Sequence, residues 1–357
     1  MKKGPIHIPS LDGLRAVSFL IVFVAHAGLG RVIPGGFGVT VFFFLSGFLI
    51  TTLMRQEYET HGAVSYRLFY LRRILRILPP FYIVLALSTL LALAHVVPGD
   101  VQVRSVVAQA AHYANYFIVE HGYVGFAKGT DVYWSLAVEE LFYLFFPLLY
   151  SMLARNGASG RTMAGTFWAI CALVLAWRVY LVYGAHAPIE RTYVATDTRI
   201  DSILFGCALA VYKNPMLDEL SEGSLPLWKF VLLPLGLVSL LGTFVVRNPE
   251  FRESFRYTVQ GLALYPVFVV AMRAPEFFPF AWLNRPGIKF VGTLSYSLYL
   301  VHYVVIFTLD ERLPVGGVAG LAIRGSLALA ISLALSYLLY LFVEKPCATL
   351  RKKYASR

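Results

Sequence analysis

The chain has 357 residues, of which 58% are hydrophobic and only 14% are charged, and its mean hydropathy is +0.66. Because soluble domains carry about 25% charged residues, this composition excludes an ordinary soluble protein and predicts a polytopic membrane protein. The formal net charge of +11 does not require a nucleic-acid partner, since cytoplasmic loops of membrane proteins are enriched in Lys and Arg. Cys171, Cys207 and Cys347 lack the paired spacing of disulfide frameworks or zinc sites, so no metal site is expected.

Apolar segments recur along the chain and predict an all-α polytopic protein with about ten transmembrane helices in a single domain over residues 1–357. The expected spans are 12–28, 36–54, 77–97, 132–152, 163–183, 198–213, 229–246, 256–272, 288–309 and 318–343. With both termini in the cytoplasm, most Lys and Arg residues fall on the inner side. The N-terminus resembles a signal peptide, but Asp12 and Arg15 interrupt its apolar core, so we expect a retained first helix.

The first expected span carries Arg15 and His26 on one face, about 16 Å apart along the helix axis. Asp12 lies one turn from Arg15 on nearly the same stripe. Ionisable side chains at membrane depth cost about 2.5–3.5 kcal/mol each on insertion scales, so they indicate a partner or a function. Since a neutral imidazole is a good general base near neutral pH, His26 is the first catalytic candidate. A histidine hydrogen-bonded to a neighbouring helix is the alternative.

The stretch 35–47, whose small residues include Ser46 and Gly47, opens the second span. Small side chains let helices pack closely, and they could also leave room for a thin ligand between helices; both explanations stay open.

Three arginines, Arg72, Arg73 and Arg76, precede Pro79 and Pro80, where we expect the third span to begin or kink. Their guanidinium groups suit phosphate oxygens bidentately. Ordinary anchoring on the cytoplasmic side is the alternative.

The fourth span begins near Trp134 and carries two adjacent carboxylates, Glu139 and Glu140, in its expected outer half. Exposing both carboxylates of an apolar span to lipid would cost a large free energy. One of them could orient His26 or bind a polar acceptor, whereas complementing the helix dipole is the structural alternative.

Two later groups lie at the same expected depth. Asp197 and Asp201 lie one turn apart, with Arg199 available to pair with them, and Tyr299 and His302 lie one turn apart in the ninth span. Internal ion pairs and tyrosine hydrogen bonds would explain both groups without a catalytic role. Between these spans, residues 98–131 predict an interfacial helix or a lid on the outer face.

Taken in order, these segments resemble the acyltransferase-3 family of integral-membrane acyltransferases. The matching segments are 11–15 with His26, 38–50, 72–79, 134–143, 199–206, 295–302 and 343–346. No single segment is diagnostic, but the ordered set covers nearly the whole chain. The ten-helix membrane domain that the resemblance implies agrees with the number of expected spans.

The resemblance implies a multi-pass protein of the bacterial inner (cytoplasmic) membrane. Such a protein moves an acyl group, usually acetyl, from cytoplasmic acyl-CoA to a hydroxyl of a surface or lipid-linked carbohydrate. Acetyl-CoA or another acyl-CoA is then a donor substrate, and no tightly bound cofactor is expected. The chain ends soon after the last expected span, so the resemblance is to stand-alone members without an SGNH hydrolase-like domain. A second transfer step would need a separate periplasmic partner protein.

The resemblance makes His26 the essential histidine and Arg15 the arginine paired with it. His26 would act as general base or form an acyl-histidine, and the sequence leaves both open. Asp12, Glu139 or Glu140 could fix its tautomer. The residues expected to bind acyl-CoA are Arg15, Arg72, Arg73, Arg76, Ser46 and Gly47. Those expected on the acceptor side are Trp134, Asp197, Arg199, Tyr299 and His302.

Two other functions stay open. The acceptor could be a small lipophilic molecule such as a macrolide. In a different class, the protein could be a non-enzymatic carrier of glycans or lipids, with the polar stripe as its translocation path. Inverted repeats or broken helices in matching halves would favour a transporter, and the sequence shows neither.

Overall fold

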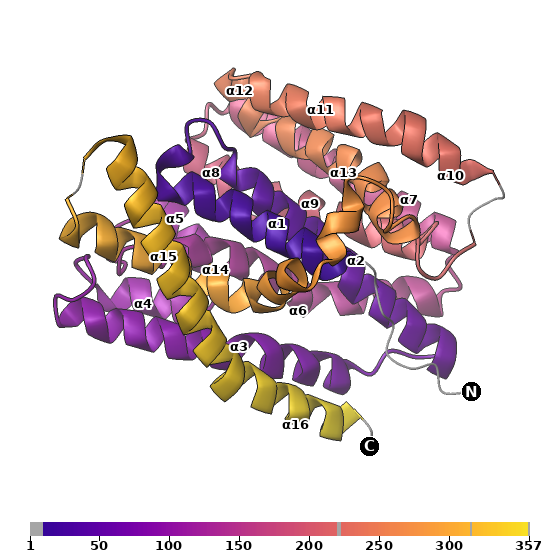
Figure 1. The fold of residues 1–357 in the computed structure, drawn as a ribbon. Coiled ribbons are helices and arrows are strands. Elements are labelled where there is room, and N and C mark those ends of the chain that lie inside the picture. The colour runs from indigo at the N-terminus through magenta and orange to yellow at the C-terminus, as the bar shows by residue number, and fades with distance from the viewer. Residues whose placement is uncertain (1–9, 220–222, 315, 356–357) are drawn as a thin grey trace.

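A computed structural model describes residues 10–219, 223–314 and 316–355 of the chain. Over these residues the protein is helical and contains no strand, which confirms the all-α class (Figure 1). The helices of eight or more residues are α1 (Leu11–Val24), α2 (Gly35–His61), α3 (Tyr66–Leu93), α4 (Val103–Ala110), α5 (Ala114–His121), α6 (Trp134–Arg155), α7 (Gly160–Val179), α9 (Thr196–Val211), α11 (Leu233–Val245), α13 (Arg256–Arg273), α14 (Pro286–Arg312), α15 (Gly317–Leu339) and α16 (Lys345–Ala355).

Short helices and turns connect or extend these elements. They are α8 (Ile189–Tyr193), α10 (Ser224–Leu227), α12 (Pro249–Glu253), the 3-10 turns Asp131–Tyr133 and Phe280–Asn284, and the π-helical turns Ala25–Leu29, Tyr180–Gly184, Trp228–Leu232 and Tyr340–Glu344. The expected interfacial segment 98–131 contains α4 and α5.

Eight helices of the described chain are long and apolar enough to cross a membrane, fewer than the ten expected. A helix forms at each of the other two expected spans, as α9 and α13. At 16 residues, α9 is about 24 Å long, short of the roughly 30 Å apolar core of a bilayer. It is also buried along most of its length by neighbouring helices, so it does not need the apolar surface of a lipid-facing span.

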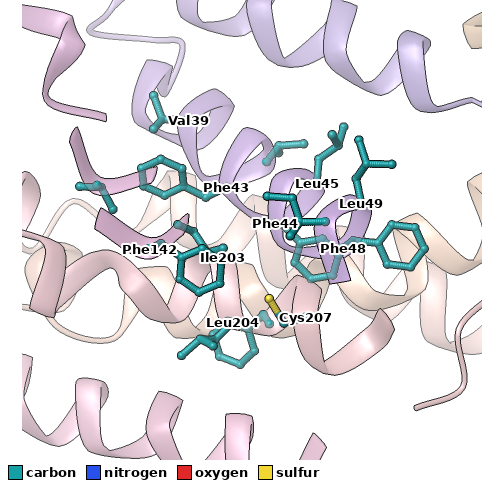
Figure 2. Close-up of a cluster of buried hydrophobic side chains, with 14 of the residues drawn as sticks. Val39, Phe43, Phe44, Leu45, Phe48, Leu49, Phe142, Ile203, Leu204 and Cys207 are labelled. Atoms are coloured by element: carbon teal, nitrogen blue, oxygen red, sulfur yellow. The ribbon is translucent and has the colours of Figure 1, made fainter. Parts of the chain in front are cut away.

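Helix α2 lies at the centre of the bundle and packs closely along α9. Figure 2 shows the contact, where Phe44 and Phe48 of α2 face Ile203 and Cys207 of α9. Glycines make this approach possible, because a methyl group on Gly47 would collide with the Ile203 carbonyl oxygen. Close backbone approach through small residues is the usual way in which membrane helices associate.

A second apolar cluster joins α1 to α14 and α15. Phe19 and Phe23 of α1 pack against Leu298 of α14 and Ala328 of α15. This packing holds the second half of α1 against the middle of α14, so that His26, in the turn after α1, lies next to His302 in the middle of α14.

The bundle has two ends, which we name by residues of α1. At the Leu11 end, the backbone N–H of Ser10 donates to Asn284 Oδ1 at 3.0 Å, and α16 packs on α3. At the His26 end, α5 contacts α8, and α8 contacts α12. In Figure 1, α4, α5, α8 and α12 gather toward the left, whereas α10 and α16 lie to the right and below.

Helix α3 differs from its expected start. It runs unbroken from Tyr66 through Pro79 and Pro80, so the prolines neither begin nor end it. Membrane helices tolerate internal proline, and next to the two prolines Tyr296 Oη of α14 donates to the Ile77 carbonyl oxygen at 2.8 Å, which ties this part of α3 to α14. The three arginines expected before the span are therefore fixed on its first turns.

Candidate functional site

A narrow cavity of about 100 Å³ lies between α1, α2, α3, α6 and α14, nearer the Leu11 end. Its lining combines the large rings of α2 with polar groups of the other helices. The polar lining residues are Arg15, Ser46, Arg73, Arg76, Ser135, Glu139, Tyr143, Ser295, Tyr296 and Tyr299.

The cationic part of this narrow cavity is formed by Arg15, Arg73 and Arg76. Arg15 contacts Asp12 at 3.4 Å, and the Arg73 guanidinium carbon lies 4.7 Å from the Tyr143 ring centre. Neither Arg73 nor Arg76 forms an ion pair within the part of the chain that the structure describes. Their guanidinium groups are thus available to an anionic ligand.

Two residues expected to bind acyl-CoA lie elsewhere. Arg72 pairs with Glu57 at 2.7 Å and does not line the narrow cavity. Gly47 faces α9, where it makes room for the Ile203 backbone rather than for a ligand. Ser46 does line the cavity, and its Oγ lies 2.5 Å from Tyr143 Oη. Sequence spacing shows which residues share a helix face, but it does not show which neighbouring helix that face contacts. The positions of Arg72 and Gly47 away from the cavity could therefore not be predicted.

The acidic pair of α6 also lies with the arginines and not with His26. Tyr143 Oη donates to Glu139 Oε2 at 2.8 Å, and Glu139 lines the narrow cavity. Glu140, the next residue along α6, does not line this cavity. Asp12 contacts Arg15 at the Leu11 end. The expectation that one of these three carboxylates orients His26 is therefore not met.

His26 is oriented by another histidine. It lies in the π-helical turn Ala25–Leu29, and its Nδ1 is 3.0 Å from Nε2 of His302, which is fully buried. Their rings are nearly parallel, with centres 5.2 Å apart, and Tyr303 stacks on the His26 ring at 4.0 Å. His302 thus contacts the candidate base directly.

The backbone around His302 assigns a tautomer to both rings. Nδ1 of His302 lies 3.0 Å from the Leu298 carbonyl oxygen and 2.9 Å from that of Tyr299. Because carbonyl oxygens only accept, this Nδ1 carries the hydrogen, and in the neutral ring Nε2 must accept. It accepts from Nδ1–H of His26, which leaves Nε2 of His26 with a free lone pair. That nitrogen is the atom a general base needs.

His26 also lines a second, wider cavity of about 470 Å³ at the His26 end. The cavity lies between the turn that joins α1 to α2 and the elements α8, α11, α12 and α13. Its charged and polar lining residues are His26, Arg31, Tyr193, Thr243, Arg247, Arg252, Glu253, Arg256 and Gln260. Arg15 and His26 therefore line different cavities, although they belong to one span.

The residues Asp197, Arg199 and Asp201 do not pair with one another as expected. Asp197 pairs with Arg191 at 2.5 Å, and Asp201 pairs with the fully buried Arg178 at 2.7 Å. Arg199 instead donates to the Tyr193 carbonyl oxygen at 2.8 Å. Structural ion pairs thus account for both carboxylates.

Arg199 lies between the two cavities within a cage of aromatic rings. Its guanidinium carbon is 4.0 Å from the Tyr257 ring centre and 5.5 Å from those of Trp134 and Tyr193. The ring of Phe43, which lines the narrow cavity, lies at 5.6 Å. Such cation–π contacts stabilise this buried cation, which forms no ion pair with a carboxylate among the residues that the structure describes.

Tyr299 marks the point where the narrow cavity approaches the histidines. Its hydroxyl donates to the Val132 carbonyl oxygen at 3.0 Å and lies 2.7 Å from Ser135 Oγ. Its ring centre is 5.7 Å from that of His302. The polar residues of the narrow cavity thus lead from the arginines toward the His26–His302 pair.

Sequence reasoning missed the arginines of the wide cavity and the contact between His26 and His302. The signals were present, because Tyr299 and His302 lie at the depth expected for His26, and arginines on the side expected to be outer oppose the positive-inside tendency. Among the described residues, no three His, Cys, Asp or Glu side chains converge in a way that could hold a metal ion.

Comparison with known proteins matches residues 8–341 to the acyltransferase domain of the acyltransferase-3 family. A protein described as a candidate peptidoglycan O-acetyltransferase of Bacillus subtilis is 30% identical, over 96% of this chain and 55% of its own length. The peptidoglycan O-acetyltransferase of Listeria monocytogenes is 27% identical, over 95% of this chain and 56% of its own. The chain thus spans about half the length of these relatives. No solved structure matches significantly.

Proposed function

Because the chain belongs to the acyltransferase-3 family, we propose that it is a membrane O-acyltransferase. It moves an acyl group, in the simplest case acetyl, from cytoplasmic acyl-CoA to a hydroxyl of a surface or lipid-linked carbohydrate. The relatives named as peptidoglycan O-acetyltransferases support a saccharide acceptor. The bacterial inner membrane is the setting that fits a donor on one side and a cell-surface glycan on the other.

The observation that carries this proposal is the position of the His26–His302 pair. His26 lines the wide cavity, and His302 lies behind it, next to Tyr299 of the narrow cavity. A thioester that reaches this point from the narrow cavity meets a base whose free Nε2 is available. A hydroxyl in the wide cavity can approach the same atom.

In the reaction, Nε2 of His26 removes the proton from the acceptor hydroxyl as its oxygen attacks the thioester carbonyl carbon. The C–O bond forms, the C–S bond breaks, and the CoA sulfur leaves with the proton that His26 took up. General-base assistance of this kind contributes about 10²–10⁴ in rate. An acyl-histidine formed at the same Nε2, with release of CoA before the acceptor reacts, is the other route, and a stoichiometric burst of free CoA in the absence of acceptor distinguishes the two.

On the donor side, Arg73 and Arg76 would hold phosphate groups of the CoA moiety, while Arg15 contacts polar atoms deeper in the cavity. Guanidinium groups suit phosphate oxygens geometrically, and neither Arg73 nor Arg76 forms an ion pair within the described chain, although Glu139 lines the same cavity. The remainder of the narrow cavity is lined by aromatic and aliphatic side chains. Such a lining suits the thin pantetheine arm.

The proposal is tested with the purified full chain in lipid nanodiscs, supplied with acetyl-CoA and cell-wall oligosaccharides. Release of free CoA together with an O-acetylated saccharide, detected by mass spectrometry, is the expected result. The His26→Ala variant should release neither. Binding and transmembrane movement of glycans without any CoA release would instead identify a non-enzymatic carrier.

A further inference from the structure

Positive charge gathers around the wide cavity. Four arginines line it, namely Arg31, Arg247, Arg252 and Arg256, and Glu253 is the one acidic side chain among its described lining residues. The Glu253 carboxylate faces Arg256 at 3.4 Å and accepts from Thr192 Oγ1 at 3.0 Å. It therefore offsets the charge of Arg256 and not that of the other three.

Among the described residues, no carboxylate offsets the positive charges of Arg31, Arg247 and Arg252. None of the three forms an ion pair with the described chain, and all three are exposed. Arg247 donates through its guanidinium group to the Arg31 carbonyl oxygen at 2.9 Å, which ties the α1–α2 turn to the end of α11. The cations are thus held around one opening.

The inner part of the cavity carries a fourth cation with unused hydrogen-bonding capacity. Arg256 is 9% exposed and lines the cavity, and its Nε has no hydrogen-bond partner among the described residues. A buried donor without a partner is costly. A ligand oxygen would satisfy it.

Clustered cations repel one another, and a concave wall of low dielectric concentrates their field. An anion in the cavity removes this repulsion and is drawn to it from solution. On the orientation of the proposed function, these arginines also lie on the outer side, where membrane proteins tend to have fewer Arg and Lys residues. Anchoring to the membrane therefore does not explain them.

We propose that the wide cavity binds an anionic acceptor. A carboxylate or phosphate oxyanion of the acceptor is held by Arg31, Arg247 and Arg252, while a hydroxyl of the same molecule reaches Nε2 of His26. At about 470 Å³, the cavity falls within the roughly 300–1,000 Å³ of small-molecule sites. The inference rests on the proposed function, because it names the substrate class of that same site.

The test measures binding, so it does not depend on turnover. The full chain in nanodiscs is titrated calorimetrically with a hexuronic acid oligosaccharide, with the same oligosaccharide after reduction of its carboxyl groups, and with a polyprenyl-diphosphate disaccharide. We expect an anionic probe to bind more tightly than the reduced one. Arg252→Gln or Arg247→Gln should weaken that binding by about 10- to 100-fold, and Arg161→Gln, an exposed arginine of α7 outside the cavity, should not.

The probes also identify the oxyanion. Charge-dependent binding of the hexuronic acid oligosaccharide assigns a carboxylate, and charge-dependent binding of the diphosphate probe alone assigns a phosphate. Equal binding of charged and reduced probes, binding of neither anionic probe, or unchanged affinity in both cavity variants overturns the inference. If the protein transfers acetyl groups equally well to charged and neutral acceptors, this inference is wrong and the proposed function stands. If it binds oxyanions but never consumes acetyl-CoA, the proposed function alone is wrong.

Discussion

The two cavities differ in the way each surrounds its charged groups. The narrow cavity, at about 100 Å³, sets its arginines among large rings and beside Glu139, whereas the wide cavity, at about 470 Å³, has three exposed arginines around its opening. A narrow passage suits a substrate of one fixed shape, and a wide chamber suits varied or bulky substrates. If the narrow cavity holds the donor and the wide cavity the acceptor, as proposed, mutations should change the selection of one substrate without changing that of the other.

The largest effect should follow from His26→Ala, which removes the proposed general base from the wide cavity. Transfer should fall by about 10²–10⁴, while the affinity for acetyl-CoA stays nearly unchanged because the arginines of the narrow cavity are untouched. Initial rates of CoA release and calorimetric titration with acetyl-CoA measure the two quantities. His61→Ala, at the exposed end of α2, is the matched control. A fully active His26→Ala protein would remove this residue from the mechanism.

His302→Phe should have the next largest effect, because it keeps a ring in place but removes the acceptor for Nδ1–H of His26. Misplacing a reacting group by about 1 Å can cost about 10²-fold, so we expect a fall in kcat of that order with little change in KM for acetyl-CoA. His302→Gln puts an acceptor oxygen near the position of Nε2 and should restore part of the rate. Equal loss in both variants, accompanied by a lower Tm, would indicate a role in packing only.

A smaller effect should distinguish the arginines of α3. Arg76→Gln should raise KM for acetyl-CoA about tenfold through loss of one charged hydrogen bond, because Arg76 lines the narrow cavity. Arg72→Gln is the matched control, since Arg72 pairs with Glu57 outside the cavity. Steady-state kinetics at varied acetyl-CoA concentration gives both values. Equal changes in KM for Arg76→Gln and Arg72→Gln would mean that the position of Arg76 in the narrow cavity does not matter for acetyl-CoA binding.

The smallest effect should lie outside both cavities, at Asp218 beyond the end of α9. Burial raises the pKa of this carboxyl, but hydrogen bonds from Arg55 outweigh it and hold the pKa below its ordinary value. The stabilisation is therefore present at neutral pH and is lost as the pH falls through the carboxyl range. Asp218→Asn should lower the free energy of unfolding by about 1 kcal/mol at pH 7 and less at pH 3, without changing kcat. Thermal unfolding at the two pH values measures it, and Glu59→Gln, at the exposed partner of Arg55, is the control.

The sequence predicted the helical class well, because long apolar segments have few other structures available in a bilayer. The sequence was less informative for helices that are covered by other helices and not by lipid, because such helices do not need an apolar surface. The segment expected as a membrane span over 198–213 does form a helix, α9, but its neighbours enclose it and it is not among the helices long and apolar enough to cross a membrane, and Pro79 and Pro80 suggested a helix start inside α3. Both errors concern groups whose partners come from distant parts of the chain.

In the candidate site, too, the sequence predicted individual residues but not the contacts between distant parts of the chain. Arg15, Arg73 and His26 could be singled out by type and position, since ionisable side chains at membrane depth are rare. The partner of His26 could not, because residues 26 and 302 meet only after α1 packs on α14. Nor could the separation of Arg72 from Arg73, because helical spacing says which residues share a side and not which neighbour each one meets.

Arg199 has a consequence for the permeability of the membrane. Its caged guanidinium lies between the residues of the two cavities and is fully buried. A fixed positive charge in a constriction raises the energy of any cation or hydrated proton that passes it. If the chain takes a thioester from one side and a sugar from the other, as proposed, it must not let protons leak across the membrane, and we expect the positive charge of Arg199 to oppose such a leak.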